Sequence, residues 1–203
     1  MPLNSSKLIL GVDEAGRGPL AGPLAVGVVA YEEGYDLLSL FPGLNDSKKL
    51  SEKKRIELFK KVQEEMHAGR VKVCVKLSSA KMIDEKGVTY AINHALARGV
   101  RQLLPDPATG KVWLDGSLKA PSEYEQETVV GGDALIPAIM LASVCAKVTR
   151  DYHMEKLAEE YPQYGFDVHK GYGTKAHYAA LKLRGTCPEH RQLFLRKWNA
   201  GKT

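Results

Sequence analysis

The sequence has few cysteines and no long apolar run. Its three cysteines, Cys74, Cys145 and Cys187, are far apart, odd in number and without the spacing of a zinc site. This scarcity argues against a disulfide-stabilised secreted protein and predicts reduced thiols. No apolar stretch is long enough to span a bilayer, and residues 1–7 lack the apolar core and cleavage site of a secretory signal. We therefore expect a cytoplasmic protein with no membrane partner.

Internal repeats, low-complexity stretches and an obvious linker are also missing from the chain. With 203 residues, 44% hydrophobic and 26% charged, the composition is that of a globular protein that can bury a substantial core. We expect a main α/β domain over residues 1–160 and a helical, basic C-terminal region over residues 161–203 that packs on it. Nothing in the sequence requires more than a monomer.

The positive charge is unevenly distributed. The formal net charge is +5, and residues 147–203 contain 11 Lys and Arg against 6 Asp and Glu, which leaves 18 of each kind in the rest of the chain. A neutral body joined to a basic third is suited to a polyanionic partner such as nucleic acid. Charge alone is equally compatible with a solvated basic surface that binds nothing.

Short apolar runs alternate with segments of helical spacing along the chain. Apolar runs over residues 8–14 and 24–31, separated by a Gly/Pro-rich turn, predict an antiparallel hairpin. The order of the elements predicts an α/β fold, with a mixed sheet covered by helices. The other expected elements are strands at residues 71–77, 111–115 and 129–133, helices at residues 51–68, 88–104 and 136–160, and a short helix capped by Ser78 or Ser79.

The most informative segment is residues 13–23, where Asp13 and Glu14 are followed at once by a turn that begins with Gly16. Two adjacent carboxylates at the end of a buried strand are costly to desolvate unless a divalent cation or a cationic substrate group lies beside them. The simpler alternative is a strand that ends in solvent. Neighbours on a regular strand point to opposite faces, so the two carboxylates can share a metal only if the strand bends there.

Two further carboxylates, Asp115 and Asp133, are each predicted at the end of a strand, and strand ends of one sheet can converge. A set of oxygen donors without His or Cys suits Mg²⁺ or Mn²⁺ better than zinc. Two such ions, roughly 4 Å apart, would activate a water and stabilise the leaving oxygen in phosphodiester cleavage. The alternatives are an N-cap for Asp133 and a turn residue for Asp115.

Several other residues have the chemistry of a nucleic-acid site. The backbone of Gly16-Arg17-Gly18 is open to close approach and could test for a 2′-hydroxyl, while Arg17 suits either a phosphate or a neighbouring carboxylate. Ser143, Lys147 and Arg150 share one face of a helix, which fits a phosphate track or an ordinary solvated stripe.

Residues 169–174 place Tyr172 between two glycines in a basic segment, where its ring could stack on a sugar or base. The alternative is a turn that enters a helix, with Thr174 as its N-cap, and both descriptions can hold together.

Taken together, these motifs resemble those of bacterial type 2 ribonuclease H, or ribonuclease HII. The resemblance covers nearly the whole chain, in the order residues 13–23, 44–50, 115–116, 132–133, 142–151 and 169–174. Alanine after Asp13-Glu14 and the lack of a long N-terminal domain favour type 2 over the sister type 3 enzyme. The resemblance implies a ribonuclease H-like sheet, which makes residues 1–160 the catalytic domain.

The resemblance also implies an activity and a set of site residues. It implies endonucleolytic hydrolysis of RNA in RNA–DNA hybrids and at single ribonucleotides in duplex DNA, as in ribonucleotide excision repair, leaving 3′-hydroxyl and 5′-phosphate ends. The metal-binding catalytic carboxylates would be Asp13, Glu14, Asp115 and Asp133. The substrate would be bound by Gly16, Arg17, Gly18, Tyr172 and, as phosphate contacts, Lys48, Ser143 and Lys147. The competing hypotheses are a module that binds hybrid duplex without cutting it and a nuclease specific for DNA.

Overall fold

The computed structural model describes residues 7–201, without the side chains of Lys197 and Asn199, and contains one five-stranded mixed sheet. Residues 1–6, which enter the prediction about a secretory signal, and residues 202–203 lie outside the described residues. The strands are β1 (Leu8–Ala15), β2 (Leu24–Glu32), β3 (Val71–Ser78), β4 (Gly110–Asp115) and β5 (Glu125–Val129). Their order is β3-β2-β1-β4-β5, with β1–β2 and β2–β3 antiparallel and the other two pairs parallel. The predicted α/β class and opening hairpin are confirmed.

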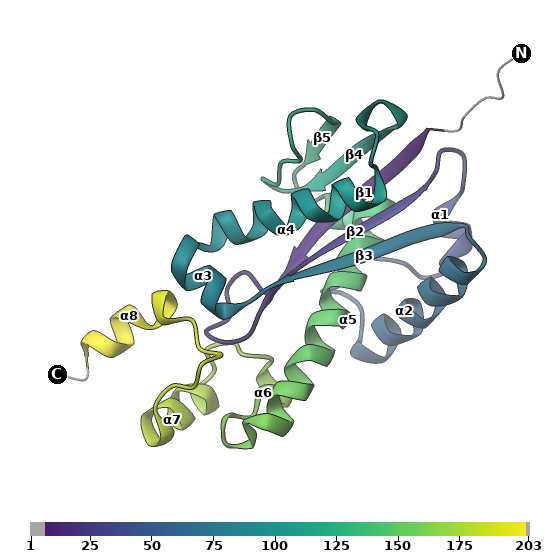
Figure 1. Cartoon of the computed structure of the whole chain (residues 1–203). Coiled ribbons are helices and arrows are strands. Elements are labelled where there is room, and N and C mark those ends of the chain that lie inside the picture. Colours follow the sequence, from purple (N-terminus) through teal and green to yellow (C-terminus); the bar gives the residue numbers. More distant parts are fainter. Residues whose placement is uncertain (1–6, 202–203) are drawn as a thin grey trace, which may run out of the picture.

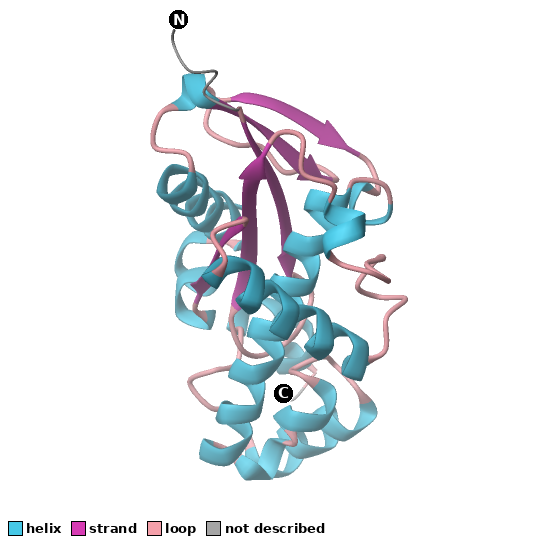
Figure 2. Ribbon diagram, turned by 90° about the vertical axis from the view of Figure 1, so that its right-hand side faces the viewer, coloured by secondary structure: helices cyan, strands magenta, loops and turns pink. Residues whose placement is uncertain are grey.

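Helices cover both faces of the sheet. The α-helices are α1 (Leu37–Leu40), α2 (Glu52–His67), α3 (Ala80–Lys86), α4 (Val88–Leu103), α5 (Pro137–Glu160), α6 (Phe166–His169), α7 (Lys175–Arg184) and α8 (Gln192–Ala200). Figure 1 shows α4 across one face of the sheet and the long α5 behind it, with α2 beside α5. Figure 2 shows the same layers from the side, with the strands in the upper part and a mainly helical part below them.

Local sequence signals explain where several helices begin. The side chains of Ser51 and Ser79 accept hydrogen bonds from Lys54 N and Met82 N, so each caps the helix that follows it. Ser79, and not Ser78, is therefore the cap of the short helix. The start of α8 is tied to α3, because the carboxylate of Asp84 accepts hydrogen bonds from the first two backbone N–H groups of α8, at 2.8 and 2.9 Å.

The predicted strand at residues 129–133 is wrong in its position. Strand β5 ends at Val129, and the chain then turns at Gly131 (φ 69°) into a short 3₁₀ helix, η2 (Gly132–Ala134). The apolar pair Val129-Val130 suggested a buried strand, but the strand is built from the polar residues before it and pairs only with β4. An edge strand needs no apolar run because one of its sides stays in solvent.

Close packing of α5 on the sheet fixes the site's position. A Cβ atom on Gly11 of β1 would lie 2.2 Å from the backbone of Ala138, and one on Gly27 of β2 would lie 2.3 Å from the carbonyl oxygen of Ala142. Because both strands have glycine at the contact, the α5 backbone lies directly on the sheet. The next residue of α5, Ser143, is thereby placed beside the end of β1.

Residues 161–201, called the C-terminal region below, follow α5. A buried apolar cluster joins this region to the turn after β1 and to the end of α5. Its members are Leu20, Ala21, Met154, Leu157, Tyr164, Phe166, Leu181 and Leu195. The region also contains two short helices, the 3₁₀ helix η3 (Pro162–Tyr164) and the α-helix α6. Among residues 7–201, no helix combines the length and the apolar character needed to cross a membrane.

Candidate active site

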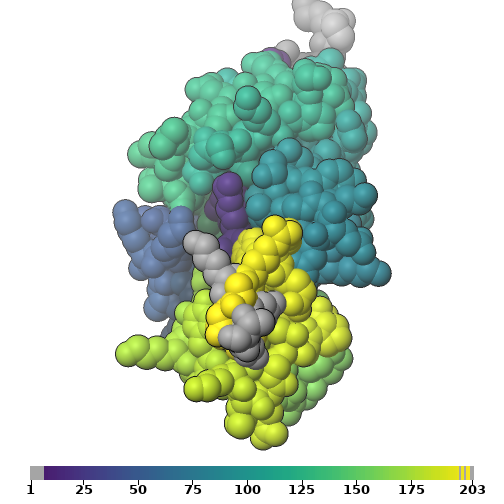
Figure 3. Space-filling model, turned by 90° about the vertical axis from the view of Figure 1, so that its left-hand side faces the viewer, coloured from purple at the N-terminus to yellow at the C-terminus, as the bar shows by residue number. Residues whose placement is uncertain are grey.

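A pocket of about 270 Å³ opens beyond the ends of β1 and β4, beside α5. Every site residue predicted from the sequence lines it, except Asp133 and Arg150. The lining residues are Asp13, Glu14, Ala15, Gly16, Arg17, Gly18, Ser47, Lys48, Arg55, Asp115, Ser143, Lys147 and Tyr172. Figure 3 shows the N-terminal segment (purple) reaching one face of the molecule between the middle of the chain (blue and teal) and the C-terminal region (yellow and green). Distant parts of the sequence therefore meet at this pocket.

Asp13 and Asp115 lie side by side at the ends of two parallel strands, because the register pairs Val12 with Leu114 just before them. The Asp13 residue is only 5% exposed. Burial raises the pKa of Asp13 to about 8; a hydrogen bond from Ser143 lowers it, and the charges of Glu14 and Asp115 raise it. Burial and like charges both disfavour the carboxylate. The pocket therefore gathers carboxyl groups whose ionised forms the protein itself stabilises only in part.

Glu14 reaches the same pocket without a bend in the strand. The pairing with β2 stays regular through Glu14–Val26 and Ala15–Ala25, and the chain turns only at Gly16 (φ 84°). The strand therefore does not bend between Asp13 and Glu14, the condition set above for two neighbouring carboxylates of a strand to share a metal. Both carboxylates line the pocket because it lies beyond the strand end and not on one face of the sheet. Burial raises the pKa of Glu14, while the nearby Arg17, 3.8 Å away, lowers it.

Asp133 stands at the rim of this group, in η2 and not at a strand end. Its backbone N–H donates to Oδ1 of Asp115 at 3.2 Å, and its Oδ2 accepts a hydrogen bond from Nζ of Lys48 at 2.7 Å. It does not cap α5, whose N-cap is Ile136. The N-cap alternative for Asp133 is thus excluded, and a direct contact joins it to Asp115.

The chemistry of these donors fits a hard divalent cation. All four side chains are carboxylates, and two of them have pKa values raised by burial. Within residues 7–201, however, no group of three or more His, Cys, Asp or Glu side chains closes around one point. Cationic side chains stand in part of the space instead, Lys48 on Asp133 and Arg17 beside Glu14. Oxygen donors and uncompensated negative charge are what Mg²⁺ or Mn²⁺ requires.

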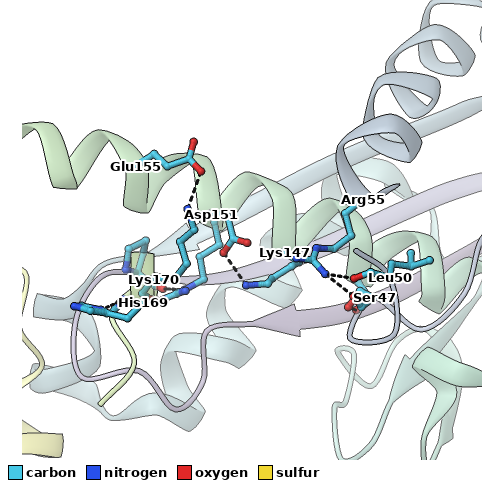
Figure 4. A network of polar contacts seen from close by, with 12 residues as sticks. Ser47, Leu50, Arg55, Lys147, Asp151, Glu155, His169 and Lys170 are labelled. Carbon is cyan, nitrogen blue, oxygen red and sulfur yellow. Dashed lines mark hydrogen bonds and ion pairs between the residues drawn. The ribbon is translucent and has the colours of Figure 1, made fainter. Parts of the chain in front are cut away.

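The predicted phosphate contacts occupy different environments. Ser143 is buried, and its hydroxyl lies 2.8 Å from that of Ser47. Lys147 is partly exposed and donates to Asp151 at 2.8 Å, while Arg55 donates to the carbonyl oxygens of Ser47 and Leu50. Figure 4 shows the contacts of Lys147 with Asp151 and of Arg55 with Ser47 and Leu50, beside α5. Ser143 is thus placed to hold Asp13, whereas Lys48 and Lys147 keep ammonium groups at the surface of the pocket.

The structure corrects the prediction that Arg150 shares a phosphate-binding helix face with Ser143 and Lys147. Its side chain is fully buried and donates to the carbonyl oxygens of Pro23, Ala21 and Lys170 at 2.9, 3.3 and 2.9 Å. Helical spacing put Arg150 on the face of Ser143 and Lys147, but near the end of that face the C-terminal region covers α5. Arg150 therefore holds backbone and is not open to a phosphate.

A second buried arginine, Arg191, holds the turn after β1 and was missed by sequence reasoning. Its guanidinium donates to the carbonyl oxygens of Gly16, Arg17 and Gly22 at 2.8, 3.0 and 2.9 Å. Burial and the charge of Arg150 lower the pKa of Arg191 to about 9. No local pattern marks this residue, because its partners lie more than 160 residues away in the sequence.

The loop that bears Tyr172 is bound to the same turn, since Leu20 N donates to the carbonyl oxygen of Gly171 at 2.8 Å. Tyr172 is 44% exposed, and the guanidinium carbon of Arg150 lies 5.8 Å from its ring centroid. Thr174 caps α7 by accepting from His177 N, so the predicted capping role is confirmed.

Buried histidines support this loop from inside. The carbonyl oxygen of Tyr172 lies 2.9 Å from Nδ1 of His177, whose Nε2 lies 3.0 Å from Nε2 of His190. Nδ1 of His190 accepts from the backbone N–H of Cys187 at 2.9 Å. This chain of partners requires both rings to be neutral, and burial lowers the pKa of His177 and that of His190, the latter to about 4.

Comparison with known proteins gives a consistent result. The family model for Ribonuclease HII matches residues 10–200. The chain is 43% identical over 194 residues to the Ribonuclease HII of Delftia acidovorans, covering 96% of this chain and 78% of that protein. It is 44% identical over 190 residues to that of Coxiella burnetii, covering 94% and 89%. Among solved structures, the RNase HII of Archaeoglobus fulgidus, determined as a complex with PCNA, is 25% identical with a TM-score of 0.74, covering 91% of this chain and 93% of that one.

Proposed function

Since this chain belongs to the ribonuclease HII family and is a ribonuclease H, we propose that it hydrolyses RNA in RNA–DNA hybrids and at single ribonucleotides embedded in duplex DNA. The observation that carries the finer proposal is the pocket itself, in which a group of carboxylates adjoins a Gly-Arg-Gly turn whose last two residues, Arg17 and Gly18, are exposed. The first feature suits phosphodiester hydrolysis, and the second suits recognition of a ribose.

We assign the chemistry to the carboxylate side of the pocket. Asp13, Glu14, Asp115 and Asp133 would hold two divalent cations, Mg²⁺ or Mn²⁺. Such ions stabilise the attacking water and the leaving oxygen of a phosphodiester. Ser143 orients Asp13 by its hydrogen bond, and the contact between Asp133 N and Asp115 fixes these two groups relative to each other. The products would carry 3′-hydroxyl and 5′-phosphate ends.

We assign substrate binding to the other residues that line the pocket, which lie beside the carboxylates. Lys48 and Lys147 have ammonium groups at the pocket surface and would bind phosphate oxygens. Gly16, Arg17 and Gly18 would test for the 2′-hydroxyl, because no Cβ atom at Gly18 stands between the backbone and the pocket. Tyr172, with an exposed ring at the rim, would pack against the sugar at the RNA–DNA junction.

The experiment that tests this function is a cleavage assay on end-labelled duplexes with Mg²⁺, with Mn²⁺ and with a chelator. The substrates are an RNA–DNA hybrid, a DNA duplex with one ribonucleotide, and the same duplex in all-DNA form. We expect metal-dependent cutting at ribonucleotides and an intact all-DNA duplex. Equal cutting of the all-DNA duplex indicates a DNA nuclease instead. Salt-dependent binding without product indicates a binding module.

A further inference from the structure

One buried arginine holds the inner side of the turn that the proposed function assigns to ribose recognition. Arg191 has no exposed surface, and its three donor positions bind the carbonyl oxygens of Gly16, Arg17 and Gly22. Its backbone N–H binds a fourth carbonyl, that of Leu20, at 2.7 Å. No residue of the turn itself supplies these contacts. Arg191 therefore holds the chain at Gly16, Arg17, Leu20 and Gly22, while Arg150 holds it at Ala21.

These contacts determine which backbone groups the pocket can use. In a trans peptide the C=O and N–H of one unit point in opposite directions. The carbonyls of Gly16 and Arg17 point inward to Arg191, so the N–H groups of Arg17 and Gly18 point outward. Both residues are exposed and line the pocket, and neither N–H has a partner among the described residues. The turn thus presents two hydrogen-bond donors to whatever enters.

We propose that Arg191 is a positioning residue that directs the N–H groups of Arg17 and Gly18 into the pocket and thereby sets the selectivity of cleavage for ribose. This inference rests on the proposed function. Two fixed donors match an acceptor atom, and the oxygen of a 2′-hydroxyl is such an acceptor where deoxyribose has none. Without the guanidinium, three inward carbonyls would lack partners, and each peptide unit could rotate to seek them.

A lysine cannot replace Arg191 in this role. The guanidinium is planar and donates in fixed directions, which matches carbonyls on three residues at once. An ammonium group keeps the positive charge but is a single point on a flexible stem. Arg191→Lys therefore separates geometry from charge: it retains the cation and loses the arrangement.

The first experiment measures kcat and KM of Arg191→Lys on the single-ribonucleotide duplex, and its affinity for the all-DNA duplex. We expect kcat to fall about 100-fold, the scale of loss for a small misplacement at a reacting centre. Affinity for the all-DNA duplex should stay within about twofold, because the lysines that bind phosphate are unchanged. A wild-type kcat in Arg191→Lys overturns the proposal.

Leu181→Ala is the matched control for stability. Leu181 is buried in the apolar cluster of the C-terminal region and lies in α7, outside the turn and the pocket. Its truncation destabilises the same region without changing the contacts of Arg191. We expect Leu181→Ala to keep its kcat at temperatures where it is folded. If it loses as much kcat as Arg191→Lys at equal thermal stability, Arg191 acts only on folding and the proposal is wrong.

A second experiment uses the wild-type protein, so it does not depend on whether a variant folds. In the absence of nucleic acid, NMR should find the Arg191 Nε–H slow to exchange with solvent, and the Arg17 and Gly18 amides fast. A rapidly exchanging Arg191 Nε–H overturns the positioning role, whatever the activity. Absence of cleavage by the wild type, with this exchange pattern intact, instead contradicts the proposed function.

Discussion

Buried charge has different partners in two parts of the molecule: the carboxylate side of the pocket, and the two arginines that hold the turn after β1, Arg150 in α5 and Arg191 in the C-terminal region. Asp13 is buried and Glu14 is partly buried, both close to Asp115, and burial raises the pKa of both. Arg150 and Arg191 are also buried, yet their guanidinium groups bind backbone carbonyls of the turn and the Tyr172 loop. The carboxylates have few partners within the protein and can bind a ligand, whereas the two arginines hold the backbone of the turn after β1 and of the Tyr172 loop.

The difference shows which groups are free to react. A buried charge that the protein itself satisfies stabilises a conformation, and a buried charge left uncompensated favours binding of the opposite charge. The same distinction separates Asp13 from Glu65, a carboxylate on α2 that is equally buried. Glu65 is bound by Lys61 and Arg70, whose hydrogen bonds lower its pKa to about 2.

The largest expected effect comes from breaking the carboxylate side. Asp13→Asn removes a carboxylate that we propose as a cation ligand and should lower cleavage of the single-ribonucleotide duplex by on the order of 1000-fold or more. In the presence of a chelator its melting temperature should rise, because the amide is neutral without taking up a proton, whereas the buried Asp13 carboxyl, with a pKa of about 8, must be protonated to be neutral. The two measurements are initial rates in Mg²⁺ or Mn²⁺ and thermal unfolding.

Glu65→Gln is the matched control for this change. It also replaces a buried carboxylate by an amide, but it removes the charged partner of Arg70 and one of the two carboxylates that Lys61 binds. We expect normal cleavage and a lower melting temperature, the opposite of Asp13→Asn in both respects. Equal activity of Asp13→Asn and the wild type would contradict the assignment of the chemistry to this side.

The next largest effect is expected from Gly16→Ala, which should lower kcat/KM about 100-fold by displacing the turn after β1. Gly16 has φ 84°, and a Cβ atom there would lie 2.0 Å from Nε of Arg150. Gly16→Ala must therefore shift the turn or the arginine, which should lower both the melting temperature and cleavage. The assay is the ribonucleotide duplex, with unfolding followed in parallel.

Gly18→Ala, two residues away, sharpens this result. Nothing lies within 4 Å of a Cβ atom at Gly18, so the folded protein can accept the methyl group. We expect an unchanged melting temperature with a loss of cleavage of about tenfold, because the methyl group stands where the substrate approaches. If Gly18→Ala cleaves like the wild type, the turn at Gly18 does not contact the substrate.

The smallest expected effect is a change of stability with pH, caused by the buried histidines behind Tyr172. Burial and the neighbouring His177 lower the pKa of His190 to about 4, from an ordinary value of 6.5. In the unfolded chain, His190 therefore binds a proton below about pH 6.5, whereas in the folded protein it binds one only below about pH 4. Stability should fall by about 2 kcal/mol between pH 7.5 and 5, a factor of about 30 in the unfolding equilibrium.

Denaturant unfolding at several pH values measures this dependence. His190→Gln should make the slope of stability against pH shallower between pH 6.5 and 4 than it is in the wild type. A slope unaffected by His190→Gln would mean that this ring is not held in its neutral form. The absolute stability of each variant does not enter, since only the slopes are compared.

Much of the fold followed from local patterns. Apolar runs predicted β1, β2 and β4, and serine caps predicted the starts of α2 and α3, because these signals act between near neighbours. The strand at residues 129–133 failed because β5 is a polar edge strand. Arg150 was assigned to a phosphate-binding face because helical spacing says which residues share a face, but not what covers that face.

The sequence by itself determined the chemistry available to this protein: carboxylates at Asp13, Glu14, Asp115 and Asp133, an open turn at Gly16 to Gly18, and a tyrosine between glycines. Motif order and strand patterns sufficed for this, since they depend on residue type and short spacing. Only the tertiary structure decided how the site is held. Contacts of Arg191 with Gly16 and of Lys48 with Asp133 join residues 175 and 85 positions apart. Packing of α5 and the C-terminal region creates such contacts, and no local propensity encodes them.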